Sequence, residues 1–180
     1  MMTANDQAAD ADAPATGPKP KDVAKAVAFG LRSTQQRPQT VAEITEKLRG
    51  RFDDGGVVEA AVGQLVDVGA LDDAAFARLW VEDRGERRGY GIARLRRELY
   101  RRKVPDEIVE EALAALDGRD DAQTARELAR KRYATLPAKL EPAAVARRLH
   151  AYLVRRGYSE GLSNVIAIEV SGLDRHRNWD

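Results

Sequence analysis

The fold is decided by the stretch from Leu71 to Leu116, LDDAAFARLWVEDRGERRGYGIARLRRELYRRKVPDEIVEEALAAL. It contains three helix-start signals. Asp72 is a predicted N-cap, because its carboxylate can accept hydrogen bonds from the first-turn N–H groups. Gly91 interrupts the chain before a second apolar stripe, and Pro105 suits the first turn of a third helix. The stretch therefore predicts three short amphipathic helices, which must pack on one another to bury their apolar stripes.

This unit is repeated along the chain. Leu48, Leu99 and Leu153 occupy matching positions, with offsets of 51 and 54 residues. The segment Asp72–Arg78 is echoed by Asp120–Arg126, in the same order relative to the basic helix that follows. A near-constant period of this size is typical of stacked helical units.

The same segments resemble the RecX family of regulators of the RecA recombinase. The resemblance is carried by Leu65–Ala77, by Gly89-Tyr90-Gly91 with Leu95, Glu98 and Leu99, and by Leu153–Tyr158. It covers roughly residues 23–168 and is strongest in the central repeat. The chain departs from the family pattern at 52–56, a small insertion, and at 161–164, where the family has a better helix. The resemblance implies tandem three-helix units that bind a RecA filament and mainly inhibit its strand exchange and ATP hydrolysis.

We therefore predict an all-α fold with about nine helices in an elongated array. The predicted divisions are a disordered leader (1–21), repeat 1 (22–71), repeat 2 (72–118), repeat 3 (119–168) and a polar tail (169–180). The helices are expected near 22–32, 40–51, 57–68, 72–86, 91–102, 106–116, 120–133, 141–156 and 159–168. Residues 165–170 could also be interpreted as a strand, but we prefer a helix.

Composition narrows the class of protein. Charged residues make up 33% of the chain and aromatic residues only 6%, which suits thin helical modules better than one deep core. The chain has no cysteine, so disulfides and thiolate metal sites are excluded. No apolar run approaches the length of about 20 residues that spans a bilayer. We expect a cytoplasmic monomer without a membrane partner.

The sequence shows no apparatus for catalysis. No glycine string ends in the Gly-Lys-Ser/Thr that a phosphate loop needs, and Gly89-Tyr90-Gly91 is more simply a helix breaker. His150 and His176 are too few for a histidine metal site, and Asp72-Asp73 is more simply a helix start. We therefore expect no enzyme, no catalytic residue, no metal and no cofactor.

Charge is banded along the chain. The overall net charge is only +1, but residues 53–83 carry −7 and residues 84–103 carry +7. Such banding favours a charged partner. The predicted basic face, a candidate surface for RecA or DNA, consists of Arg84, Arg87, Arg88, Arg94, Arg97, Arg101, Arg102, Lys103, Arg155 and Arg156.

Two functions remain open on these residues. The first is a regulator that binds the RecA filament, with single- or double-stranded DNA as a further contact. The alternative is a helix-turn-helix transcription regulator that reads DNA with residues 91–103, although that helix lacks the Asn or Gln expected to read bases. On a helical wheel Arg94, Arg97 and Arg101 face away from Leu95 and Leu99. Their replacement by Glu is expected to abolish binding and leave the fold intact.

Overall fold

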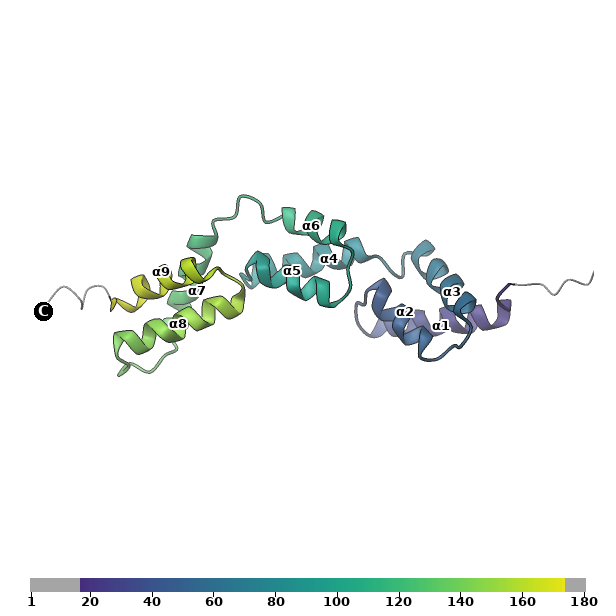
Figure 1. Ribbon diagram of the computed structural model, residues 1–180, viewed down its shortest axis with the longest axis horizontal. Coiled ribbons are helices and arrows are strands. Elements are labelled where there is room, and N and C mark those ends of the chain that lie inside the picture. The colour runs from purple at the N-terminus through teal and green to yellow at the C-terminus, as the bar shows by residue number, and fades with distance from the viewer. Residues whose placement is uncertain (1–16, 174–180) are drawn as a thin grey trace, which may run out of the picture.

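The computed structural model describes residues 17–173, and within that range the chain forms nine α-helices, one π-helix and no strand. The helices group into three successive bundles of three, which lie in an elongated row (Figure 1). This confirms the predicted all-α array. The first helix begins at Pro20, inside the predicted leader; residues 1–16 of that leader and 174–180 of the predicted tail lie outside the described residues.

The first unit consists of α1 (Pro20–Gln36), α2 (Val41–Arg49) and α3 (Gly55–Asp67). A capping box starts α2: the Thr40 side chain accepts from the Glu43 N–H, and the Glu43 side chain accepts from the Thr40 N–H. The predicted insertion at 52–56 supplies the N-cap of α3 and its first two residues. One apolar core joins the three helices; its fully buried side chains include Ile44, Leu48, Ala61 and Leu65.

The second unit consists of α4 (Asp73–Val81), α5 (Ile92–Arg101) and α6 (Asp106–Ala114). Asp72 caps α4 as predicted, by accepting a hydrogen bond from the Ala75 N–H. The three helices share one core, made by Phe76, Ala77, Val81, Leu95, Leu99, Val104, Val109, Ala112, Leu113 and Leu116. Residues 72–116 thus form one packing unit, whereas Leu71 belongs to the core of the first unit.

A π-helix (η1, Glu82–Arg87) continues α4, at the place where the sequence predicted the end of an α-helix over residues 72–86. Gly85, at its centre, is buried, and a Cβ at this position would lie 2.9 Å from Leu116 Cδ1 and 3.1 Å from Leu95 Cδ1. Glycine therefore lets the widened turn pack directly on the core. Wide turns of this kind are frequent at functional sites, and this one leads into the basic helix α5.

The third unit consists of α7 (Asp121–Tyr133), α8 (Pro142–Arg156) and α9 (Glu160–Ser171). Residues 165–170 are helical, as predicted, and Ser159 caps α9 by accepting from the Leu162 N–H. Gly157 ends α8 with a φ of 96°, in the left-handed region that glycine adopts without strain. Two neighbouring apolar clusters form the core of this unit.

The middle helices of the three units are joined end to end. The Thr40 hydroxyl, at the N-cap of α2, donates to the Arg102 carbonyl at the C-cap of α5 over 2.8 Å. The Gly91 N–H, at the N-cap of α5, donates to the Arg156 carbonyl at the end of α8, also over 2.8 Å. Each contact satisfies groups that a helix end leaves free. We call these two contacts the first joint and the second joint.

Candidate functional site

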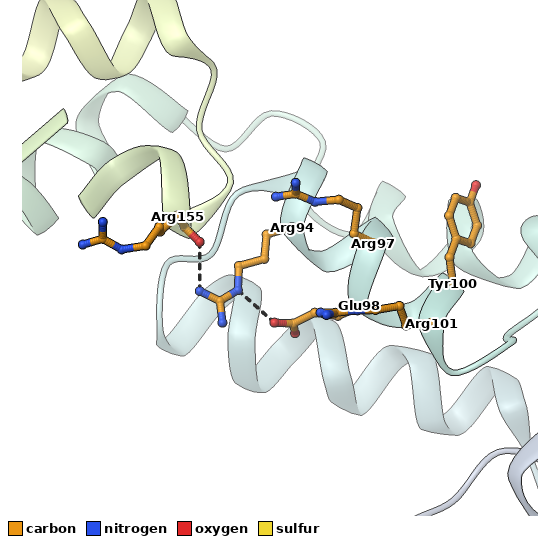
Figure 2. Close-up of a pocket in the computed structure, with 6 residues that line it drawn as sticks. All are labelled: Arg94, Arg97, Glu98, Tyr100, Arg101 and Arg155. Atoms are coloured by element: carbon orange, nitrogen blue, oxygen red, sulfur yellow. Dashed lines mark hydrogen bonds and ion pairs between the residues drawn. The ribbon is translucent and has the colours of Figure 1, made fainter. Parts of the chain in front are cut away.

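A groove of about 620 Å³ opens along α5 beside the end of α8, between the second and third units. Figure 2 shows its lining, in which four arginines, one tyrosine and one carboxylate gather: Arg94, Arg97, Glu98, Tyr100, Arg101 and Arg155. Four of these were on the predicted basic face. Arg155 comes from the third unit, so the groove depends on how the second joint is held.

Glu98 organises one wall of the groove. Its side chain is only 10% exposed and accepts from Arg94 Nε over 2.8 Å and from Trp80 Nε1 over 3.1 Å. Arg84 Nε lies 3.3 Å from the second carboxylate oxygen, and the Arg84 guanidinium also stacks on the Trp80 ring. A shielded carboxylate with several donors is held firmly. Glu98 therefore ties α4, η1 and α5 together beneath the exposed cations.

Three cations of the groove are open to solvent. Arg97, Arg101 and Arg155 are exposed, and none of their side chains forms an ion pair within residues 17–173. Arginine presents a fixed fork of donors that matches carboxylates and phosphates. With Tyr100 exposed beside them, these residues form a surface suited to an anionic partner.

The structure places Arg94 differently from the helical wheel. Its guanidinium donates to Glu98 and, over 3.0 Å, to the Arg155 carbonyl, and it stacks on the Tyr90 ring at 3.9 Å. Arg94 thus crosses the second joint. Its replacement by Glu would set two carboxylates against each other, so the expectation that the fold stays intact does not hold for this arginine.

The other members of the predicted basic face have partners inside the molecule. Arg87 and Arg88 pair with Glu82 and Asp83, Arg102 and Lys103 with Glu43 and Glu46 of the first unit, and Arg156 donates to the Arg88 carbonyl. The face is therefore not one continuous surface. It divides into an open groove and two sets of cations that hold neighbouring elements.

Sequence reasoning missed one partner of the basic helix. Arg96 makes two hydrogen bonds of 2.7 Å to the Glu110 carboxylate on α6, and this contact lowers the pKa of Glu110. Within α5 itself, the only acid is Glu98, so the partner of Arg96 had to come from another helix. The packing of α6 on α5, already predicted from Pro105, was the signal that could have suggested this pair.

The second joint brings two backbones into direct contact. A Cβ on Gly91 would lie 2.4 Å from the Gly157 carbonyl oxygen and 3.1 Å from the Tyr158 nitrogen. A Cβ on Gly157 would lie 2.5 Å from Arg94 Cβ. Both glycines are therefore required for this approach, which also places Arg155 opposite α5.

Replacing Gly91 with alanine is expected to open the second joint. The added methyl would meet backbone atoms that cannot rotate away, so we expect a destabilisation of roughly 1–3 kcal/mol. Hydrogen exchange at the Gly91 amide and X-ray scattering would report the change. Gly161→Ala is the matched control, because a Cβ there meets nothing within 4 Å. Equal exchange protection in Gly91→Ala and the parent protein would contradict the close contact.

Tyr158 gives the second joint a dependence on alkaline pH. Its buried hydroxyl donates to the Gly89 carbonyl over 2.8 Å, and burial raises its pKa to about 12, from an ordinary value of about 10. A raised tyrosine pKa means that this stabilisation is complete below pH ~10 and is lost as the pH rises towards ~12. Urea unfolding between pH 8 and 11.5 should therefore show a falling stability that Tyr158→Phe does not share. The Phe variant should be less stable by about 1 kcal/mol at pH 8; parallel pH profiles would contradict this role.

Within residues 17–173, no cluster of three or more His, Asp or Glu side chains is placed to hold a metal ion. None of the helices in that range is both long and apolar enough to cross a membrane.

Comparison with known proteins decides the family. Models of the second and third three-helix domains of RecX match residues 72–113 and 119–164. The regulatory protein RecX of Thermobifida fusca (strain YX) is 40% identical over 161 residues, which cover 88% of this chain and 86% of the relative. This chain belongs to the RecX family. The regulatory protein RecX of Mycobacterium sp. (strain KMS) is 37% identical and covers 86% of both chains.

Solved RecX structures share the fold. The crystal structure of RecX from Lactobacillus salivarius superimposes with a TM-score of 0.64 at 20% identity, covering 83% of this chain and 97% of that one. A second RecX crystal structure gives a TM-score of 0.62 at 22% identity. At this identity the likeness concerns the helical array alone. The predicted family and the predicted fold are both confirmed.

Proposed function

We propose that this protein binds the RecA filament, lowers its strand exchange and ATP hydrolysis, and performs no catalytic step of its own. The observation that carries the proposal is the groove between the second and third units. Within residues 17–173, the side chains of Arg97, Arg101 and Arg155 form no ion pair, whereas Arg94, Arg96 and Arg102 of the same basic segment are paired with carboxylates. Membership of the RecX family supports RecA as the partner, and the elongated row of similar units suits a partner with repeated subunits.

The contacts of α5 favour this function over a helix-turn-helix transcription regulator. Arg94, Arg96 and Arg102 bind Glu98, Glu110 and Glu43, so they are not free to enter a major groove. The exposed cations that remain carry no accompanying Asn or Gln on this helix. Such a surface suits phosphates or acidic side chains without base readout.

The test reverses the three open cations together. The variant Arg97→Glu, Arg101→Glu, Arg155→Glu should bind RecA filaments on single-stranded DNA at least roughly tenfold more weakly, and should no longer lower ATP hydrolysis. Because all three side chains are exposed, its melting temperature should stay close to that of the parent. Co-sedimentation with filaments and a melting curve measure both quantities on one preparation.

The control changes the same total charge elsewhere. Arg49, Arg78 and Lys131 are also exposed. Their joint replacement by Glu should leave the affinity for filaments within about threefold of the parent, because only the general effect of the changed net charge remains. Parallel titrations with naked single-stranded DNA decide whether DNA is a direct contact. If the groove variant melts normally and still binds filaments like the parent, the groove is not the RecA-binding surface.

A further inference from the structure

One arginine recurs at the end of every middle helix. Arg51, Arg102 and Arg156 are separated by 51 and 54 residues, the offsets of the repeat. Each guanidinium lies over an aromatic ring of its own unit: Arg51 over Phe29 at 5.1 Å, Arg102 over Trp80 at 4.4 Å and Arg156 over Tyr152 at 4.9 Å. These three residues therefore present the same group at the same end of each unit.

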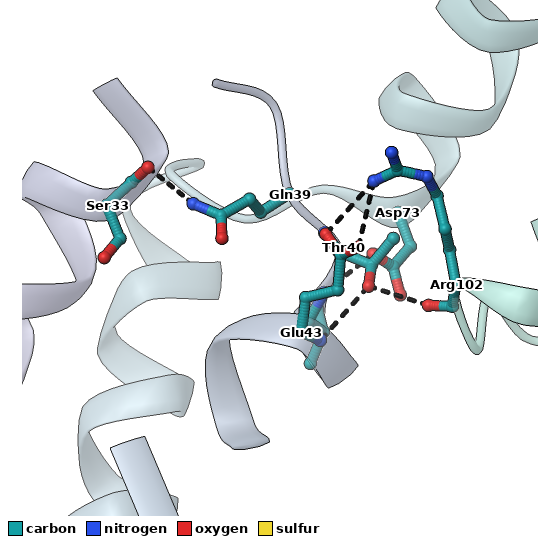
Figure 3. Close-up of polar contacts among 7 residues, drawn as sticks. Ser33, Gln39, Thr40, Glu43, Asp73 and Arg102 are labelled. Carbon is teal, nitrogen blue, oxygen red and sulfur yellow. Dashed lines mark hydrogen bonds and ion pairs between the residues drawn. The ribbon is translucent and has the colours of Figure 1, made fainter. Parts of the chain in front are cut away.

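In both joints this arginine holds the preceding unit. Arg102 Nη1 donates to the Glu43 carboxylate over 2.9 Å, while its carbonyl accepts from the Thr40 hydroxyl (Figure 3). Beside it, Lys103 Nζ lies 3.2 Å from the Glu46 carboxylate. In the second joint, Arg156 donates instead to the Arg88 carbonyl, which lies three residues before the N-cap of α5. In the first joint, the second unit thus binds the acidic start of α2, in which the Thr40 hydroxyl is the N-cap and the Glu43 and Glu46 carboxylates follow three and six residues later.

The first unit has the same end, and within residues 17–173 no other unit packs against it. A hollow of about 550 Å³ lies there, lined by Phe29, Arg32, Ser33, Gln36, Lys47, Gly50 and Arg51. It contains three cations and no acid. None of the three side chains forms an ion pair within residues 17–173. Arg51 is thus placed as Arg102 is in the first joint, but among these described residues no carboxylate lies opposite it as Glu43 lies opposite Arg102.

We propose that this end of the first unit is a docking site for an acidic helix N-terminus of another protein. The partner would place a capping hydroxyl and a carboxylate against Arg51, as Thr40 and Glu43 do against Arg102. The site lies on the first unit, whereas the groove lies between the second and third. The inference therefore stands independently of the proposed binding to RecA.

The middle helices of a second copy of this chain do not supply that group. Thr40 and Glu43 are engaged in the first joint, and Gly91 is engaged in the second. The equivalent position in the third unit is Val145, which lies buried inside α8, because that helix begins earlier, at Pro142. The third unit thus lacks the free helix start that would continue the row.

The experiment follows arginine side-chain resonances of the full chain by NMR. The probe is an alanine-rich helical peptide that begins Thr-Ala-Ala-Glu-Ala-Ala-Glu, and the matched control peptide carries Gln in place of both Glu. The acidic peptide should shift the Arg51 Nε–H signal in a saturable manner, at concentrations that leave the Arg97 and Arg101 signals unchanged. The Gln peptide should leave Arg51 unchanged.

Two exposed substitutions test the assignment. Arg51→Glu and, separately, Lys47→Glu should lower the affinity for the acidic peptide at least roughly tenfold, which corresponds to about 1.4 kcal/mol of binding free energy. Arg49→Glu, on the same helix but outside the hollow, should change affinity less than about twofold. Melting curves confirm that each variant is folded.

Three results would overturn the proposal. In the first, the peptide shifts Arg97 and Arg101 but not Arg51. In the second, a single-stranded oligothymidine shifts Arg51 and the acidic peptide does not, which would make the end a nucleic-acid contact. In the third, removal of residues 1–16 itself shifts the Arg51 Nε–H signal and strengthens peptide binding. That segment carries Asp6, Asp10 and Asp12 and no Lys, Arg or His. The occupant would then be the chain's own leader.

Discussion

Replacing Glu98 with alanine should destabilise the central unit by about 3–5 kcal/mol, the usual cost of removing one partner of a shielded ion pair. The carboxylate accepts from Trp80 and Arg94 and lies beside Arg84, while only 10% of its side chain is exposed. Its loss leaves two half-buried guanidinium groups and an indole N–H without their acceptor. Urea unfolding followed by circular dichroism measures the effect.

Two control variants separate charge from position. Glu98→Gln keeps the shape and one acceptor oxygen, so its cost should fall between those of the parent and Glu98→Ala. Glu111→Ala removes an exposed acid from the neighbouring α6 and should cost less than about 0.5 kcal/mol. The network also orients Arg94 across the second joint, so Glu98→Ala should weaken filament binding even where the protein remains folded. A Glu98→Ala protein as stable as Glu111→Ala would show that the network does not support the unit.

Leu99→Ala should destabilise the central unit by roughly 2–5 kcal/mol, because it leaves a cavity among side chains that cannot fully collapse. Leu99 is completely buried, in the core that joins α4, α5 and α6. Leu95, one turn earlier on the same stripe, is equally buried, and Leu95→Ala should cost a similar amount. Hydrogen exchange along α5, together with urea unfolding, measures the local and the global change.

Leu79→Ala is the matched control for these core variants. Leu79 is 61% exposed on α4, so its truncation should change stability by less than about 0.5 kcal/mol. The core variants should lose filament binding only in proportion to the unfolded fraction, since neither leucine reaches the groove. Comparable stabilities of Leu99→Ala and Leu79→Ala would contradict the buried stripe that defines the unit.

The helices were largely determined by local sequence. Asp72, Asp120 and Ser159 cap the helices that follow them, and such caps act within one turn of the chain. The apolar stripe containing Leu95 and Leu99 follows from helical periodicity alone. The π-helix at 82–87 could not be foreseen, because its wide turn is stabilised by the packing of Gly85 on Leu95 and Leu116, far along the chain.

The candidate site could be predicted from the sequence only in part. The concentration of arginine on α5 was visible in the sequence, and Arg97 and Arg101 are exposed as expected. The pairing of Arg96 and Arg102 depended on acids of other helices, 14 and 59 residues away in the sequence. A helical wheel describes one helix in isolation, and it cannot show which carboxylates neighbouring helices bring to it.

The helices, the repeat and the family could be predicted from sequence, because they depend on short-range periodicity, capping and motif spacing. Which cations remain without an internal partner depends instead on how the units pack. That choice depends on two joints in which Thr40 meets Arg102 and Gly91 meets Arg156. Coulombic and hydrogen-bond energies change within a few ångströms. Distances across those joints, which no local pattern encodes, therefore separate an internally paired arginine from one that stays open to solvent.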